Sequence, residues 1–269
     1  MCETAAMAVS DEDLDAIPGW FDAIDRELFR WFLGSGREIS GPGHLVELGS
    51  YMGQSAVLIG DHLQDGETFT IIDLFEAPAD DEANSQENSE SYAGLSRQAF
   101  ERYYRGVHPA LPTVVQDFSE RIVDHVEAAS TRFMHVDASH LYEHVVLDIA
   151  AAKRLLATDG VVVFDDFRSG HTPGVAAAVW SAVATEGLRP IVVSPNKLYA
   201  TWGEPAPYID GVATTSPWWT SEVQDVSGGR LLILSPRAHE TYRWIKYLPP
   251  AAVPGAKKAR ARLAALTRR

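Results

Sequence analysis

Short apolar runs alternate with longer amphipathic stretches along most of this chain. We expect strands over residues 44–48, 68–73, 112–116, 132–136 and 161–165. We expect helices over about 95–106, 119–129, 142–156 and 174–184. Strands and helices that alternate in this way are typical of a Rossmann-like, doubly wound α/β fold, in which ligands bind at the carboxyl ends of parallel strands.

The two ends of the chain depart from this alternation. Residues 24–32 predict an amphipathic helix before the core, and residues 191–202 predict an antiparallel hairpin that closes a seven-stranded, mostly parallel sheet. We therefore divide the chain into an N-terminal helical extension (1–35), a core (36–205) and a C-terminal extension (206–269), which belongs to the same domain or to a dimer contact.

Within these regions, several segments are harder to interpret. Residues 77–94 are polar and acidic and predict a mobile insertion, and residues 207–217 have the composition of a loop. Residues 229–235 predict a further strand and residues 241–247 a short helix or strand. The tail over 257–269 is basic and predicts a helix that packs on an acidic surface.

Two of the predicted strands end abruptly at carboxylates. One run is Phe133-Met-His-Val-Asp-Ala-Ser-His140, and the other is Val161-Val-Val-Phe-Asp-Asp-Phe167. A buried strand does not hold an unpaired charge in its middle, so Asp137, Asp165 and Asp166 are expected to cluster at the rim of the sheet. Three oxygen donors suit a hard divalent cation such as Mg²⁺, although an acidic pair can also simply mark the end of a strand.

A second signal is the run His44-Leu-Val-Glu-Leu-Gly-Ser-Tyr-Met-Gly-Gln-Ser55. An apolar strand leads into a glycine-containing turn and then a helix, an arrangement that lets backbone approach a negatively charged ligand group. The spacing is G-x-x-x-G, so it lacks the dinucleotide fingerprint. About 20 residues further on, the next strand ends at Asp73, where a carboxylate can bind two ribose hydroxyls. Together these features favour an adenosine-containing ligand.

At this point the sequence resembles a known family. The motifs V-E-L-G-S-Y-M-G, I-I-D, H-V-D-A-S-H-x-Y-E and L-x-x-D-G-V-V-V-F-D-D-F resemble those of class I S-adenosylmethionine-dependent methyltransferases. Within that class they are most similar to the metal-dependent sugar O-methyltransferases of macrolide, aminocoumarin and mycobacterial polysaccharide pathways. The resemblance covers roughly residues 40–202 and is weak or absent in the first 35 and last 60 residues.

The resemblance implies roles for particular residues. It implies Mg²⁺ ligands at Asp137, Asp165 and Asp166, and a general base at His140, which stands three residues after the first ligand. Other family members have an aspartate where this chain has Ser139, which favours His140 as the base; His144 is the second candidate. The expected cofactor-binding residues follow the first three strands: Glu47, Gly49, Ser50, Tyr51, Gly53, Ser55, Asp73 and Asp117.

The composition limits which partners and which cellular location are expected for this chain. The chain has 269 residues, is 46% hydrophobic and contains no apolar run of about 18 residues, so we expect an enzyme without a membrane span. A net charge of -14 disfavours nucleic acid as a partner. One cysteine and an acidic N-terminus without secretory-signal features favour the cytoplasm. The unassigned ends make a homodimer plausible.

The expected activity is therefore methyl transfer from S-adenosylmethionine to a hydroxyl of a sugar or saccharide, with Mg²⁺ and a histidine base. The acceptor itself, its methylated hydroxyl and the oligomeric state are left open by the sequence. A catechol-type acceptor, a nicotinamide or nucleotide-sugar enzyme on a related sheet, and a non-catalytic binding protein are the alternatives. Tyr208, Trp218 and Trp219 either stack on sugar faces or fill a core or dimer interface.

Overall fold

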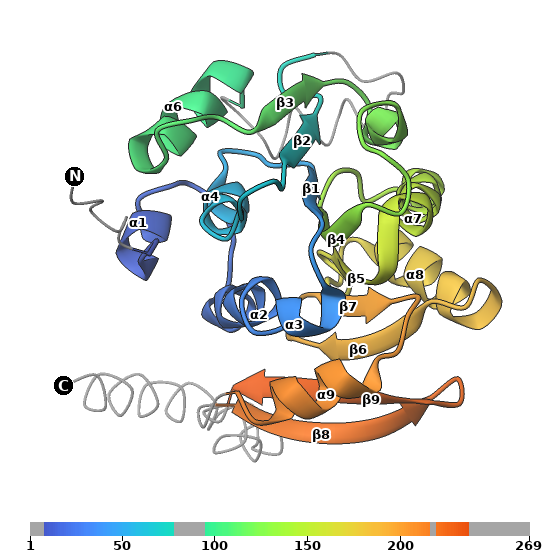
Figure 1. Cartoon of the computed structure of the whole chain (residues 1–269). Coiled ribbons are helices and arrows are strands. Elements are labelled where there is room, and N and C mark those ends of the chain that lie inside the picture. The colour runs from blue at the N-terminus through green and yellow to red at the C-terminus, as the bar shows by residue number, and fades with distance from the viewer. Residues whose placement is uncertain (1–7, 78–94, 216–218, 237–269) are drawn as a thin grey trace, which may run out of the picture.

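A single twisted sheet runs through the computed structural model, which describes residues 8–77, 95–215 and 219–236. In the described part of the chain, nine strands are hydrogen-bonded in the order β3-β2-β1-β4-β5-β7-β6-β9-β8 (Figure 1). The first five strands in sequence are parallel to one another: β1 (His44–Leu48), β2 (Phe69–Asp73), β3 (Thr113–Gln116), β4 (Thr131–Val136) and β5 (Leu156–Phe164).

The other four strands extend this sheet beyond β5. They are β6 (Arg189–Val193), β7 (Leu198–Thr201), β8 (Trp219–Val226) and β9 (Gly229–Pro236). β7 is antiparallel to both β5 and β6, β9 is parallel to β6, and β8 pairs with β9 as an antiparallel edge strand. The C-terminal extension therefore continues the same sheet through β8 and β9.

Helices cover both faces of the sheet (Figure 1). One hydrophobic cluster packs the sheet against α1 (Asp11–Asp15), α2 (Ala23–Leu33), α4 (Gln54–Gly60), α6 (Arg97–Val107) and α9 (Ala206–Ala213). The short α3 (Arg37–Ser40) precedes β1. A second cluster packs the opposite face against the 3₁₀ helix η1 (Ser119–Asp124), α7 (Tyr142–Leu155) and α8 (Pro173–Thr185). Because both faces are covered, β4 is buried along its whole length, as parallel strands usually are.

The predicted fold class is confirmed, and most core elements begin and end within a few residues of their expected bounds. Over the described residues the sheet has nine strands in place of the expected seven, because residues 219–236 form a hairpin that adds to β6. The helix expected over 119–129 is a 3₁₀ helix that ends at Asp124.

One local prediction is wrong. Residues 207–217 were expected to be a loop, but Ala206–Ala213 is helix α9. Pro205 and Pro207 do not prevent this helix because proline is tolerated in the first turn, where backbone N–H groups have no intrahelical acceptor. Tyr208 is fully buried against Trp31 and Phe32 and is therefore part of the core.

Several predictions concern residues outside the described part of the chain. They are the acidic insertion over 78–94, Trp218, the segment 241–247 and the basic tail 257–269. Among the helices that the structure describes, none has the length and apolar character required to cross a bilayer.

Candidate active site

A cavity of about 1060 Å³ opens where the parallel strands end. The ends of β1, β2, β4 and β5 contribute its floor, and the segment between α1 and α2 contributes one wall through Trp20, Phe21 and Asp22. Carboxylates from four strand exits line it: Asp73, Asp117, Asp137, Asp165 and Asp166. The fold thus brings together the strand-end acids that are far apart in sequence.

The turn after β1 forms one side of the cavity through Gly49, Ser50, Tyr51 and Ser55. Gly49 has φ 74°, and a Cβ at this position would collide with the carbonyl group of Asp137 at the exit of β4. Only glycine fits here, because the backbone must both take a left-handed conformation and pass against β4. This close approach fixes the glycine turn beside the acids of β4.

Asp73 holds the same turn in place. Its Oδ2 accepts hydrogen bonds from the backbone N–H of Ser50 at 2.7 Å and of Tyr51 at 3.3 Å. Its Oδ1 accepts one from the N–H of Phe75 at 2.7 Å. Burial raises the pKa of Asp73, and these hydrogen bonds oppose that shift.

Two of the expected cofactor residues lie elsewhere. Glu47 is fully buried inside the sheet and accepts a hydrogen bond from His135 Nδ1 at 2.8 Å; it is outside the cavity lining. Gly53 has φ 93°, is the N-cap of α4 and packs against Phe100. Neither residue lines the cavity, whereas Asp117 does.

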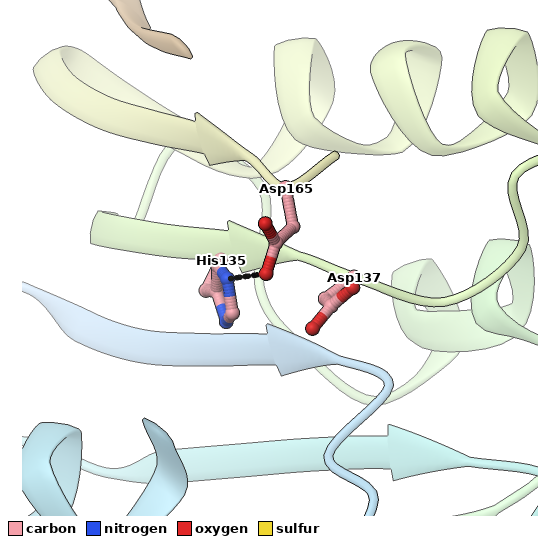
Figure 2. Close-up of side chains that lie close together, drawn as sticks. All are labelled: His135, Asp137 and Asp165. Atoms are coloured by element: carbon pink, nitrogen blue, oxygen red, sulfur yellow. Dashed lines mark ion pairs between the residues drawn. The ribbon is translucent and has the colours of Figure 1, made fainter. Parts of the chain in front are cut away.

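The three predicted metal ligands are separated into two groups. Figure 2 shows Asp137 and Asp165 facing His135 of β4, and these three residues form a compact acidic group within the described chain. Asp166 has φ 52°, a left-handed conformation, and its carboxylate pairs with His140 Nε2 at 3.1 Å. The tight turn after β5 thus sends the two adjacent aspartates to different partners.

A lysine that the sequence analysis did not select lies within this acidic group. The Lys197 ammonium forms an ion pair with Asp165 Oδ2, and Lys197 is 2% exposed. Asn196 Nδ2 donates to Asp165 Oδ1 at 2.8 Å. Burial lowers the pKa of Lys197, but the nearby carboxylates of Asp165, Asp137 and Asp25 outweigh it, so the lysine is charged at neutral pH.

The Lys197 ammonium has the opposite effect on the two nearest carboxyl groups. Burial alone would raise the pKa of Asp165, but Lys197 and His135 hold it well below its ordinary value. Burial and the charge of Asp165 raise the pKa of Asp137 well above its ordinary value. Asp165 is therefore the ionised member of the pair, and it is bound to cations of the protein.

His135, Asp137 and Asp165 lie close enough together to surround a metal ion, but two of these residues already have their donor atoms on protein groups. Both oxygens of Asp165 are already bound, one by Lys197 and the other by Asn196. The third member of the compact group, His135, has its Nδ1 on Glu47 and its Nε2 3.4 Å from Lys197 Nζ. Burial and Lys197 lower the pKa of His135, but hydrogen bonds to Asp165 and Glu47 raise it to about 9, and both ring nitrogens already lie against protein groups.

His140 lies at the mouth of this group and lines the cavity. Its Nε2 is 3.1 Å from Asp166 Oδ2 and 4.0 Å from Asp137 Oδ1. His144 lines the cavity too, and its Nδ1 is 2.9 Å from Ser139 Oγ. Of the two histidines, His140 has carboxylates placed to orient an imidazole and to stabilise its protonated form.

Sequence reasoning missed His135, Lys197, Asn196 and Asp25. His135 stands inside an apolar run that predicts a buried strand, and an ionisable residue in such a run is itself a signal that a partner exists. Lys197 directly precedes the apolar run of β7. Asp25 begins a helix and accepts a hydrogen bond from Tyr199 at 2.8 Å. Burial raises the pKa of Asp25 to about 6, although Lys197 opposes this shift.

The sheet order and the cavity at the carboxyl ends of its strands define a Rossmann-like α/β fold with a ligand cavity. Residues 46–167 match the family model of a methyltransferase domain, a range that includes the glycine turn, Asp73 and the acids after β4 and β5. No curated protein matches the chain.

Solved structures agree with this assignment. The O-methyltransferase NovP matches with a TM-score of 0.53 and 18% identity, covering 66% of this chain and 79% of its own. A protein from Corynebacterium glutamicum matches at 0.51 and 17%, covering 76% and 92%. The calicheamicin methyltransferase CalS11 matches at 0.51 and 14%, covering 75% and 88%. At such identities the likeness establishes the fold. Residues 46–167 thus match a methyltransferase domain, and the chain shares its fold with these methyltransferases, as the sequence resemblance predicted.

Proposed function

We propose that this chain transfers a methyl group from S-adenosylmethionine to a hydroxyl oxygen of a small molecule. The observation that carries the proposal is the cavity in which the glycine turn, Asp73 and the His140–Asp166 pair face one space. The glycine turn and Asp73 would hold the cofactor, and His140 would face the acceptor. NovP, an O-methyltransferase with the same fold, supports oxygen as the methyl-accepting atom.

The reaction requires alignment and the removal of one proton. The acceptor oxygen forms a new O–CH₃ bond while the S–CH₃ bond of the sulfonium breaks, and S-adenosylhomocysteine leaves. His140 takes the hydroxyl proton, and the Asp166 carboxylate stabilises the resulting imidazolium. Positioning of the two reactants in the cavity supplies much of the remaining rate enhancement.

A saccharide acceptor is the favoured class within this proposal. The cavity offers several carboxylates and polar side chains, which suit an acceptor with more than one hydroxyl. CalS11, a calicheamicin methyltransferase, shares the fold and is consistent with a natural-product acceptor. The aromatic residues expected to stack on the sugar do not support this choice, because Tyr208 is core and Trp219 donates through Nε1 to Glu27 at 2.6 Å. No step of this proposal passes through Mg²⁺, because two of its predicted ligands, Asp165 and Asp166, are paired with Lys197 and His140.

Replacement of His140 tests the base. His140→Ala should lower kcat by about 10²- to 10⁴-fold, because the acceptor hydroxyl then loses the base that takes its proton. The affinity for S-adenosylhomocysteine, measured by isothermal titration, should stay within about twofold, because the cofactor residues are unchanged. His125→Ala, at the end of η1, is the matched control and should change neither quantity.

The same measurements contain the outcomes that would contradict the proposal. An equal loss of turnover and cofactor affinity in His140→Ala would mean that His140 supports the fold of the cavity. Absence of S-adenosylhomocysteine binding to the unmodified chain would refute the methyltransferase assignment of the cavity.

A further inference from the structure

The acidic edge of the cavity contains its own fixed cation. Lys197 follows a tight turn in which Ser194 Oγ accepts from the backbone N–H of Lys197 at 2.8 Å and Ser194 N donates to the Lys197 carbonyl at 3.0 Å. The ammonium lies 5.6 Å from the centre of the Phe21 ring, within cation–π range. The backbone turn, the Phe21 ring and burial together hold the Lys197 side chain in place at the site.

The Lys197 ammonium is bound to one of the carboxylates that a divalent cation at this site would use. Asp165 is the acid at the end of β5 and faces Asp137 at the end of β4 (Figure 2). Lys197 Nζ is bound to the Asp165 oxygen that also lies 3.7 Å from His135 Nε2. A divalent ion on that carboxylate would stand beside the ammonium, and two cations at such short range in a buried site repel one another strongly.

The methyl transfer needs positive charge at this edge. Negative charge builds on the acceptor oxygen as His140 withdraws the proton, and the carboxylates of Asp137 and Asp165 would oppose that charge. Lys197 neutralises Asp165 directly and faces Asp137 and Asp25 as well. It therefore lowers the electrostatic cost of an anionic oxygen without contributing an atom to the reaction.

We propose that Lys197 takes the place of a divalent cation at this site and that methyl transfer by this chain is independent of metal. This inference rests on the proposed function for its catalytic part, while its claim about metal binding stands on the geometry of Asp165 alone. Lys197 is a positioning residue in this proposal, since it acts through the Asp165 carboxylate.

The first experiment uses the unmodified full-length chain. After treatment with a chelator, its methyltransferase activity should stay within about twofold of the untreated value, because the cation it uses is covalently part of the chain. In parallel, a titration with Mn²⁺ followed by electron paramagnetic resonance should show no bound ion in the micromolar range. A loss greater than tenfold that Mg²⁺ restores, or stoichiometric Mn²⁺ binding at micromolar concentration, would overturn the inference.

The second experiment removes the ammonium. Lys197→Met should lower kcat by on the order of 10²-fold, which is the usual effect of deleting one preorganised electrostatic group. It should also gain Mn²⁺ binding and a stimulation by Mg²⁺, because Asp165 and Asp137 are then open to a hard cation. Lys153→Met is the matched control, because that lysine is exposed and pairs with Glu186 at the surface.

A merely structural role for Lys197 would reduce activity without any gain of metal binding, and that result would overturn the proposal. If Lys197→Met does not fold, the Mn²⁺ titration is carried out on the unmodified chain and on Lys197→Arg, which keeps the positive charge. Absence of bound Mn²⁺ in both supports the inference, and stoichiometric binding at micromolar concentration overturns it. This signal does not depend on methyl transfer, so a failure of the proposed function would not be mistaken for a failure of this inference.

Discussion

Asp148 of α7 is a carboxyl group without exposed surface. Burial raises its pKa to about 7, more than the neighbouring Ser119 hydroxyl lowers it. The folded state therefore binds a proton between about pH 4 and pH 7 that the unfolded chain, with an ordinary carboxyl pKa near 3.9, has already released. The free energy of unfolding falls as the pH rises through this window, and the contribution of the neutral carboxyl is lost above pH 7.

Asp148→Asn should remove this pH dependence, because an amide has nearly the same shape and never ionises. We expect the difference in free energy of unfolding between variant and unmodified chain to move in favour of the variant by on the order of 1 kcal/mol or more between pH 5 and pH 8. Urea denaturation at both pH values measures it. Asp124→Asn, on the exposed side of η1, is the control, and an equal difference at pH 5 and pH 8 would contradict the prediction.

At the level of elements, Asp73 at the carboxyl end of β2 fixes the conformation of the glycine turn after β1. Asp73 accepts from two backbone N–H groups of that turn and from Phe75, so one side chain connects β2 to the turn after β1. The turn contains Tyr51 at φ 48°, which requires such support because a non-glycine residue is strained in the left-handed region.

Asp73→Asn should therefore weaken cofactor binding. An amide nitrogen cannot accept the N–H of Ser50 or Tyr51, and a neutral group binds ribose hydroxyls less strongly than a carboxylate. We expect the Kd for S-adenosylhomocysteine to rise by on the order of 10-fold or more, measured by isothermal titration. Asp65→Asn, in an exposed loop, should leave the Kd unchanged. An unchanged Kd in Asp73→Asn would exclude the β2 acid from cofactor binding.

At the level of the whole molecule, a buried ion pair joins segments at the amino ends of the parallel strands, opposite the cavity. Arg132 at the start of β4 contacts both oxygens of Glu67, at 3.0 and 2.9 Å. It also donates to the carbonyl of Leu33 at the end of α2 and to that of His62 beyond α4. Neither side chain is more than 4% exposed, so this pair links a strand, a loop and two helices far from the site.

Arg132→Met should lower the free energy of unfolding by about 3 kcal/mol, because Glu67 would lose its fully buried partner and keep only the partly exposed Arg37. Urea denaturation followed by tryptophan fluorescence measures this change. Arg121→Met is the control, since Arg121 is exposed and pairs only with Asp124 of its own 3₁₀ turn among the described residues. A loss below 1 kcal/mol in Arg132→Met would mean that solvent reaches the pair. Folded Arg132→Met should bind S-adenosylhomocysteine normally, because the pair lies outside the cavity lining.

How much of the structure could be predicted from the sequence also differs between single residues, elements and the whole molecule. Apolar runs that stop at Asp73, Asp137 and Asp165 were sufficient to place β2, β4 and β5, whereas Glu47 lies buried inside β1. The helix α9 was missed because Pro205 and Pro207 resemble loop residues until one knows that they occupy a helix start. The pairing of β8 with β9 and β6 depends on contacts between segments that local periodicity does not encode.

The sequence by itself determined which residues end strands, because hydrophobic periodicity is local and a charge cannot stand unpaired within a buried run. It also determined the glycine turn, since close backbone approach leaves no alternative to Gly49. Only the tertiary structure decided which charges meet. Lys197 lies 32 residues from Asp165 along the chain, and His135 lies 88 from Glu47, so neither pair has a signature in sequence spacing. Folding places these groups side by side in an interior of low dielectric constant. There the protonation state of each group depends more on its neighbours than on its residue type.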